Sequence, residues 1–182
     1  MPCGAYRIFY RRARMIARER KTMPDGTSID RQALHPKIAR AFAYWRSIHP
    51  TPGVLPGRQH LDPMAIPDVL PGVWLLDVER APLRLRYRLV GTRIVESFGR
   101  EVTGAWFDEI HPEMAQQPGY LDRYIGVVET RAPSWRRGKP KLWVRRGCSE
   151  LENIVLPFAA DGVQVDMLMA VTVLYWLDGR SE

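Results

Sequence analysis

Residues 83–92 read LRLRYRLVGT, and residues 93–100 continue as RIVESFGR. In the first part Leu or Tyr alternates with Arg, which is the period-two pattern of a strand with one buried and one solvated face. After Gly91 the apolar residues Ile94, Val95 and Phe98 recur at three and four, and Gly99 follows where a short helix would end. The segment therefore predicts a strand that leads directly into a short helix over the apolar face of its own sheet.

Further strands are predicted on both sides of this segment. Residues 73–78 read VWLLDV and predict a strand that turns at residues 80–82 into the strand at 83–90. The sequence Ala160-Asp161-Gly162 has the composition of a hairpin turn. Downstream, the candidate strands are residues 134–137, 142–146, 151–158 and 163–176.

Helices are expected in the remaining segments. Apolar residues at three and four in 35–48 predict an amphipathic helix, with Pro36 tolerated in its first turn. Proline and glycine make 49–71 an irregular connector with at most one helical turn, near residues 64–69. Short helices interrupted at Gly99 and Gly104 are expected in 92–110, and a longer helix in 119–130.

Several short motifs then occur in a fixed order between positions 34 and 177. They are Leu55-Pro56-Gly57-Arg58 with Leu61-Asp62-Pro63, Ile66-Pro67-Asp68-Val69-Leu70-Pro71, Tyr87-Arg88-Leu89-Val90-Gly91-Thr92, Phe98-Gly99-Arg100 with Thr103-Gly104, and Leu156-Pro157 with Asp161-Gly162. In this order and spacing the chain resembles the PAS domain, and more narrowly the single-domain PAS proteins of alphaproteobacterial type.

The resemblance implies an α+β fold, with a five-stranded antiparallel sheet, short helices on one face and an extra N-terminal helix. It also implies a small internal cavity, a role in sensing or in pairing proteins, and no catalytic residues. The residues that would converge on the cavity are Tyr87, Leu89, Ile94, Phe98, Trp106, Phe107, Tyr124, Val128, Leu156 and Met169. They could form a mostly apolar site for an unidentified small ligand, or simply a filled core.

The helix expected at 35–48 has two open interpretations. PAS proteins commonly place such a helix across the open sheet face or pair it with its copy in a second subunit. Phe42 and Trp45 would be the anchors of that homodimer or protein-partner interface. Alternatively, both side chains cap the core of their own domain.

The charge is concentrated at the N-terminus. The net charge is +7, and residues 1–34 hold eight Lys or Arg against three acidic residues, so the other 148 residues carry only +2. We therefore divide the chain into a basic tail, 1–33, and a single domain, 34–178. The tail could be disordered or bind an anionic surface, or translation could begin at Met23, so that the first 22 residues are not made in the cell.

The 182-residue length suits one domain, and no segment approaches the ~18 consecutive apolar residues of a membrane span. Cys3 and Cys148 form neither a CxxC pair nor a Cys/His cluster, so neither a disulfide framework nor a zinc site is expected. A cytoplasmic location fits best. No cofactor is assigned: the helix at 119–130 lacks the histidine of haem PAS sensors, and neither cysteine lies in the Asn-Cys-Arg motif of flavin photoreceptors.

Two other function classes stay open as alternatives. A small enzyme of similar shape would need an acid and base pair inside the cavity, for which Asp108, Glu109 and His111 are the nearest candidates. A charged run of this kind more often forms a solvated face or a helix cap. Residues 135–146 interleave Trp with Arg and Lys, as nucleic-acid surfaces do, but the same pattern also guards a sheet edge against aggregation.

The sequence therefore favours a cytoplasmic PAS-like module, not an enzyme, that binds a small ligand or a protein partner and signals through protein contacts. Binding of nucleic acid or an anionic membrane through the basic tail and the 135–146 hairpin is the rival expectation.

Overall fold

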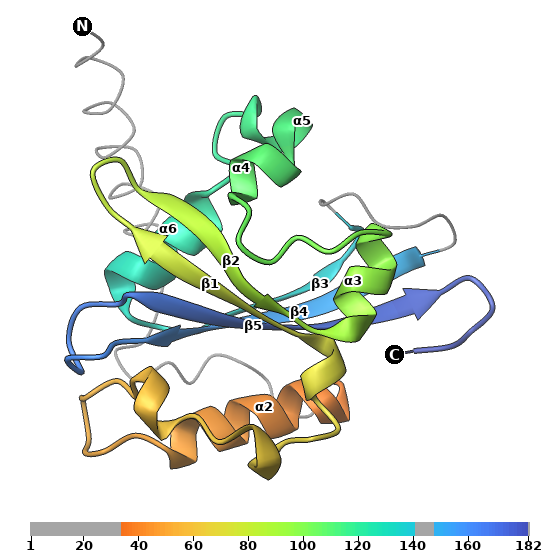
Figure 1. Cartoon of the computed structure of the whole chain (residues 1–182). Coiled ribbons are helices and arrows are strands. Elements are labelled where there is room, and N and C mark those ends of the chain that lie inside the picture. Colours follow the sequence, from red (N-terminus) through yellow and green to blue (C-terminus); the bar gives the residue numbers. More distant parts are fainter. Residues whose placement is uncertain (1–33, 141–147, 182) are drawn as a thin grey trace, which may run out of the picture.

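The computed structural model of the chain describes residues 34–140 and 148–181. The basic tail 1–33 and the strand expected at 142–146 lie outside the described residues. Within them a single sheet is covered on both faces by helices (Figure 1).

The sheet has five antiparallel strands in the order β2-β1-β5-β4-β3, which confirms the fold predicted from the sequence. Its members are β1 (Val73–Glu79), β2 (Arg84–Val90), β3 (Ser134–Gly138), β4 (Cys148–Phe158) and β5 (Met167–Trp176). The turn between β4 and β5 is longer than expected. The Asp161 carboxylate accepts the backbone N–H groups of Val163 and Gln164, and Gly162 has φ +76°, so β5 begins at Met167 and not at residue 163.

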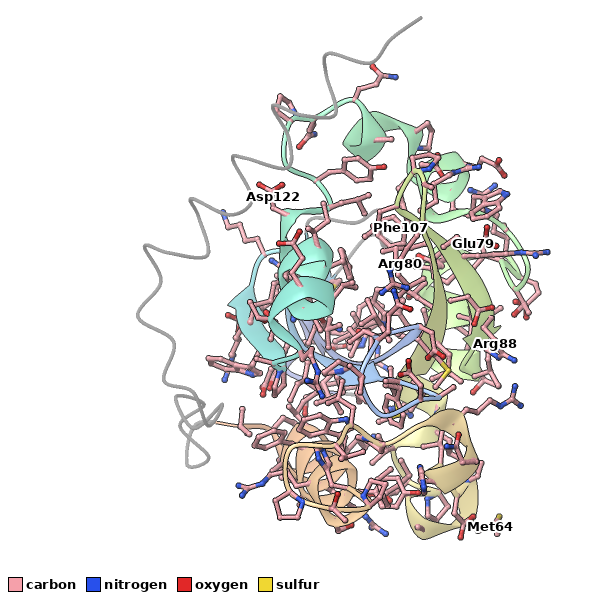
Figure 2. The ribbon with its side chains drawn as sticks, turned by 90° about the vertical axis from the view of Figure 1, so that its left-hand side faces the viewer. Met64, Glu79, Arg80, Arg88, Phe107 and Asp122 are labelled. Atoms are coloured by element: carbon pink, nitrogen blue, oxygen red, sulfur yellow. The ribbon has the colours of Figure 1, made fainter. Side chains whose placement is uncertain are left out.

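One long helix covers one face of the sheet and four shorter helices cover the other (Figure 1). The long helix is α2 (Pro36–Ser47); the shorter ones are α3 (Thr92–Phe98), α4 (Phe107–Ile110), α5 (Pro112–Ala115) and α6 (Asp122–Thr130). Three 3₁₀ turns follow α2 in the proline-rich connector, at Arg58–His60, Pro63–Ala65 and Leu70–Gly72. Figure 2 shows Met64 of this connector on the opposite side of the sheet from Phe107 of α4.

Strand register assigns side chains to the two faces, because directly paired residues in neighbouring strands point to the same side. Trp74 in β1 pairs with Ala170, and its ring lies near Tyr87 and Phe107, so this row faces α3, α4 and α6. The next row, Leu75 with Met169 and Leu156, therefore faces α2.

A β-bulge in β2 interrupts the Leu/Arg alternation of residues 83–90. Leu75 pairs with Leu89 but Leu76 pairs with Tyr87, so Arg88 is an extra residue in β2. Tyr87 and Leu89 consequently point to opposite faces of the sheet. Tyr87 is fully buried, whereas Leu89, on this edge strand, is 46% exposed.

Helix α2 is fixed to its own sheet. Phe42 and Trp45 are both buried, and the Trp45 indole N–H donates to the carbonyl of Pro157 at 2.9 Å. The structure therefore agrees with the second interpretation of this helix, in which both side chains cap the core of their own domain. Neither is exposed as an anchor for a second subunit, which corrects that expectation.

Candidate functional site

An aromatic cluster lies between the sheet and the short helices. Tyr87 is at its centre, with ring centroids 5.8 Å from Trp74, 6.3 Å from Phe98 and 5.7 Å from Phe107. Tyr124 of α6 closes the far side, 5.3 Å from Phe107. Strand β1, strand β2 and three helices thus each contribute a ring to one buried group.

Four of the ten residues predicted to line a cavity belong to this cluster: Tyr87, Phe98, Phe107 and Tyr124. Ile94 and Val128 are also buried on α3 and α6. Trp106 is only partly buried. The guanidinium carbons of Arg84 and Arg86 lie over its ring, 4.0 and 5.8 Å from the ring centroid.

Three predicted cavity residues lie on the other face. Leu156 and Met169 are in the row that faces α2, and the bulge turns Leu89 to that same side. Their placement in the cavity was wrong. A period of two determines which residues share a face only while the register is unbroken, and the register here depends on pairing between strands.

The aromatic cluster also contains His111, the residue that ends α4. Its ring is 4.8 Å from Phe107 and 5.4 Å from Phe98, and its side chain is 5% exposed. The Tyr87 hydroxyl lies 2.8 Å from Nε2 of His111. Of the described residues, none hydrogen-bonds the second ring nitrogen, Nδ1.

The surroundings keep both members of this pair neutral near pH 7. Burial, and then the positive charge of Arg100, lower the pKa of His111 to about 4. Burial raises the pKa of Tyr87 well above its ordinary value, so its hydroxyl stays protonated. A neutral imidazole and a neutral phenol can donate and accept hydrogen bonds, but their pKa values are poorly matched to proton transfer at neutral pH.

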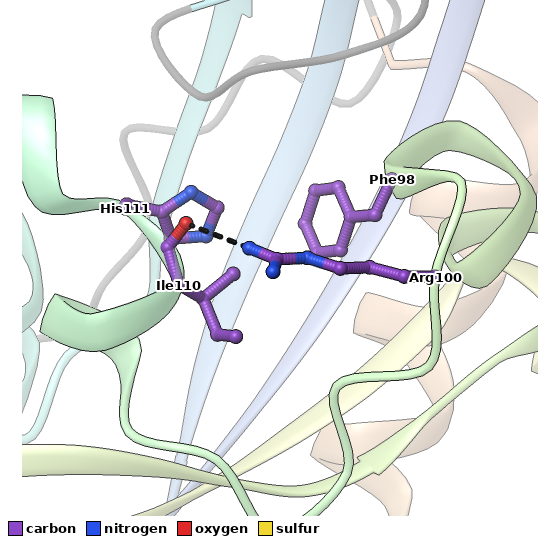
Figure 3. Close-up of a pocket in the computed structure, with 4 residues that line it drawn as sticks. All are labelled: Phe98, Arg100, Ile110 and His111. Carbon is purple, nitrogen blue, oxygen red and sulfur yellow. Dashed lines mark hydrogen bonds between the residues drawn. The ribbon is translucent and has the colours of Figure 1, made fainter.

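A pocket of about 320 Å³ opens beside His111 (Figure 3). Phe98 and Arg100 form one wall, after α3 ends at Gly99 with φ +70°, and Ile110 and His111 form the other. Arg100 reaches across, with Nη2 donating to the Ile110 carbonyl at 3.4 Å. The site therefore combines apolar surface, a cation and a neutral imidazole.

The acidic neighbours of His111 do not join it. Both carboxylate oxygens of Asp108 accept hydrogen bonds from Nη2 of Arg84, at 2.9 and 3.0 Å, and Glu109 accepts from the same nitrogen at 3.4 Å. The three groups considered for acid and base chemistry are thus divided between the surface and the interior. Within residues 34–140 and 148–181, no three His, Cys, Asp or Glu side chains gather as metal ligands would.

The sequence predicts neither Arg100 nor Ile110 as a pocket residue, and it predicts His111 in the cavity only as an acid or base of the alternative enzyme. One signal was present, because Phe107 and His111 are four residues apart and so lie on one helical face. Arg100 offered no comparable signal, since it follows a left-handed glycine whose direction depends on tertiary packing.

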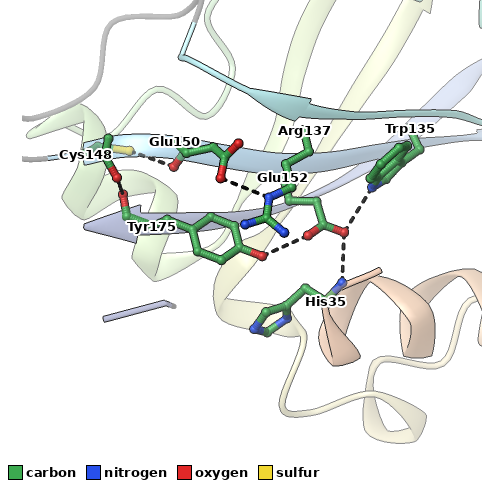
Figure 4. A network of polar contacts seen from close by, with 8 residues as sticks. His35, Trp135, Arg137, Cys148, Glu150, Glu152 and Tyr175 are labelled. Carbon is green, nitrogen blue, oxygen red and sulfur yellow. Dashed lines mark hydrogen bonds and ion pairs between the residues drawn. The ribbon is translucent and has the colours of Figure 1, made fainter. Parts of the chain in front are cut away.

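A polar network closes the α2 face (Figure 4). Glu152 of β4 is fully buried and accepts three hydrogen bonds, from the His35 backbone N–H, the Trp135 indole and the Tyr175 hydroxyl, at 3.0, 3.0 and 2.9 Å. Burial and this bond raise the pKa of Tyr175 to about 12. The carboxylate thereby fixes the start of α2 to the sheet.

In the described half of the 135–146 segment, Trp135 and Arg137 contact other residues of the same chain. The Trp135 indole is turned toward Glu152, and Arg137 pairs with Glu150 at 3.0 Å while lying over the Tyr175 ring. Residues 141–146 of that segment lie outside the described part of the chain.

No helix among the described residues is long and apolar enough to cross a bilayer.

No curated protein matches the chain. Among solved structures, the PAS domain of Bordetella pertussis BvgS is similar over 55% of this chain and 73% of that chain, with 16% identity and a TM-score of 0.39. A family model described as "PAS domain" matches residues 33–171, which is most of the chain and includes every strand of the sheet up to the middle of β5. This chain belongs to the PAS domain family.

Proposed function

We propose that this PAS domain is a sensor that binds a small ligand in the pocket between α3 and α4 and transmits the change to a protein partner through α2. PAS domains are sensory or interaction modules, and the finer assignment rests on one observation. A pocket of about 320 Å³ lies directly against His111, a buried polar side chain with one ring nitrogen left without a described hydrogen-bond partner. This volume is at the lower end of the range for small-molecule sites.

The pocket is connected to the centre of the sheet by contacting side chains. His111 bonds Tyr87, the Tyr87 ring packs on Trp74, and the Trp74 indole donates to the Thr172 hydroxyl at 3.0 Å. The Asn153 side-chain amide also donates to that hydroxyl, at 2.9 Å. A ligand that shifts His111 would therefore act on β4 and β5.

From there the contacts continue to the opposite face. Asn153 and Glu152 are consecutive residues of β4 and so point to opposite sides of the sheet. Glu152 holds the first residue ahead of α2 through the His35 N–H. Transmission along these contacts requires two arrangements of α2 that the ligand favours unequally.

Native mass spectrometry, with the denatured protein measured beside it, tests the ligand. We expect a small-molecule adduct on the native protein that denaturation removes. Ile110→Trp, which fills the pocket, should abolish the adduct, whereas Met64→Trp, on an exposed position of the connector, should retain it. An adduct of equal abundance on Ile110→Trp would place the ligand elsewhere.

Hydrogen exchange tests the output. Ligand loading should change the exchange rate of the α2 amides in the wild-type protein. Unchanged α2 amides, with altered exchange confined to α3 and α4, would contradict transmission through α2.

A further inference from the structure

We propose that the ligand is a small monoanionic carboxylate with an apolar or aromatic body, held at its carboxylate by Arg100 and Nδ1 of His111. This inference rests on the proposed function, since it names the class of compound that the same pocket would take.

The positive charge comes from Arg100. Its guanidinium lines the pocket and makes one long hydrogen bond, 3.4 Å to the Ile110 carbonyl. No carboxylate of the described residues lies within ion-pair distance of it, and its charge is the one that acts on His111. An Arg at the wall of a partly apolar pocket is well suited to a carboxylate, which matches the planar fork of its N–H donors.

His111 supplies a second donor on the same side. The Tyr87 hydroxyl, which stays protonated, can donate to Nε2, and the ring proton then lies on Nδ1. An N–H at that atom would face an anion without adding a second positive charge. One cation and one neutral donor balance a single negative charge better than the double charge of a phosphate.

The apolar walls specify the body of the ligand. Phe98 and Ile110 line the pocket opposite each other, and Phe98 belongs to the aromatic cluster. A flat ring or a short alkyl chain could pack between them while its carboxylate points to Arg100. The combination of few polar groups and apolar walls is the usual form of a specific small-molecule site.

The experiment compares carboxylates with neutral compounds of the same shape. The ligand-free protein is titrated calorimetrically with benzoate, phenylacetate and hexanoate, with the primary amide of each, and with inorganic phosphate. At least one carboxylate should bind about tenfold or more tightly than its amide, because a charge-assisted contact is lost in the amide.

Variants assign the effect to Arg100. Arg100→Gln should weaken the best carboxylate about tenfold or more and leave its amide unchanged. Arg58→Gln removes a charge that is also exposed, on the α2 side, and should change neither affinity. Urea unfolding of both variants verifies that each is folded, as expected for exposed positions.

A second measurement follows His111 directly. A carboxylate beside the imidazole favours its charged form, so binding should raise the pKa of His111, measured by NMR of its ring protons, whereas the amide should leave it unchanged. The signal is assigned by its absence in His111→Gln.

The outcomes separate the two proposals. Equal binding of a carboxylate and its amide, lost in Ile110→Trp, overturns the carboxylate and keeps the ligand pocket. Tighter binding of phosphate than of every carboxylate, or a native adduct that proves to be uncharged, also overturns the carboxylate alone. Bare native protein together with no binding by any compound overturns both proposals.

Discussion

The two faces of the sheet differ in how completely they are closed. On the α2 face, the buried carboxylate of Glu152 satisfies three donors, and Ile154, Leu156 and Met169 are fully buried. On the opposite face, the buried His111 bonds Tyr87 through one nitrogen and borders a pocket. On the first face Glu152 and its donors satisfy one another, whereas on the second face Nδ1 of His111 has no hydrogen-bond partner among the described residues, and a ligand could supply one.

Helix length explains much of this difference. The α2 helix has 12 residues and places Ile38, Ala41, Phe42 and Trp45 in one continuous apolar stripe. Helices α3, α4 and α5 have 7, 4 and 4 residues, and a glycine or proline interrupts each junction. Short helices cover a sheet as separate pieces, and the pocket lies where α3 and α4 fail to meet.

The largest effect is expected in the core beneath α2. Met169→Ala removes a fully buried side chain from the Leu75–Met169–Leu156 row and should lower the free energy of unfolding by about 2–5 kcal/mol. Urea denaturation measures the change. A loss below about 1 kcal/mol would mean that this face is not tightly packed.

The Glu152 network should give the next largest effect. Glu152→Ala leaves three donors without their acceptor and should destabilise the protein by about 3 kcal/mol. Glu150→Ala is the matched control, because it removes a carboxylate two residues away from a partly exposed ion pair with Arg137 and should cost less than about 1 kcal/mol. Equal losses from both variants would contradict the anchoring role of Glu152.

The pocket face should show its own pH dependence. The pKa of His111 is lowered to about 4 by folding from an ordinary value of 6.5, so the unfolded chain binds a proton more readily in this interval. The contribution of His111 to the free energy of unfolding is therefore fully present above pH 6.5. It decreases by at most about 3 kcal/mol as the pH falls toward 4.

Other carboxylates also titrate in this range, so the informative quantity is a difference. Wild type should lose more stability between pH 7 and pH 4 than His111→Gln does, as measured by urea denaturation at each pH. Parallel loss in the two proteins would show that His111 is not buried as a neutral ring.

The smallest effect is expected at the bulge. Leu89→Ala alters a side chain that is 46% exposed and should change stability by no more than about 0.5 kcal/mol. The comparison with Met169→Ala tests the face assignment. A loss near 2 kcal/mol would place Leu89 inside, against the register of β1 and β2.

Much of the fold could be predicted from local patterns. The apolar spacing of 35–48 and Pro36 predicted α2, and Gly99 predicted the end of α3. The five-stranded antiparallel sheet with helices on it was expected from the family resemblance. The β4–β5 turn was predicted too short, because the hydrogen bonds that Asp161 accepts in it leave no trace in an apolar pattern.

The candidate site was only partly predictable. The family resemblance predicted four aromatic members of the cluster, Tyr87, Phe98, Phe107 and Tyr124, but not Trp74 of β1. Arg100 was not predicted, because a charged residue after Gly99 gives no signal that distinguishes a pocket wall from a solvated turn. For His111 the spacing of four from Phe107 was the one local signal. Burial of His111 depends on Tyr87, 24 residues away.

By itself the sequence determined the order and type of the elements, because a period of two, a period near 3.6 and turn residues are properties of neighbouring positions. Only the tertiary structure decided which face each strand residue occupies after the bulge, and which polar groups meet. Glu152 contacts a backbone N–H 117 residues away, and Tyr87 and Leu89 separate only through pairing with β1. Such contacts form when distant segments pack together, so no local pattern carries them.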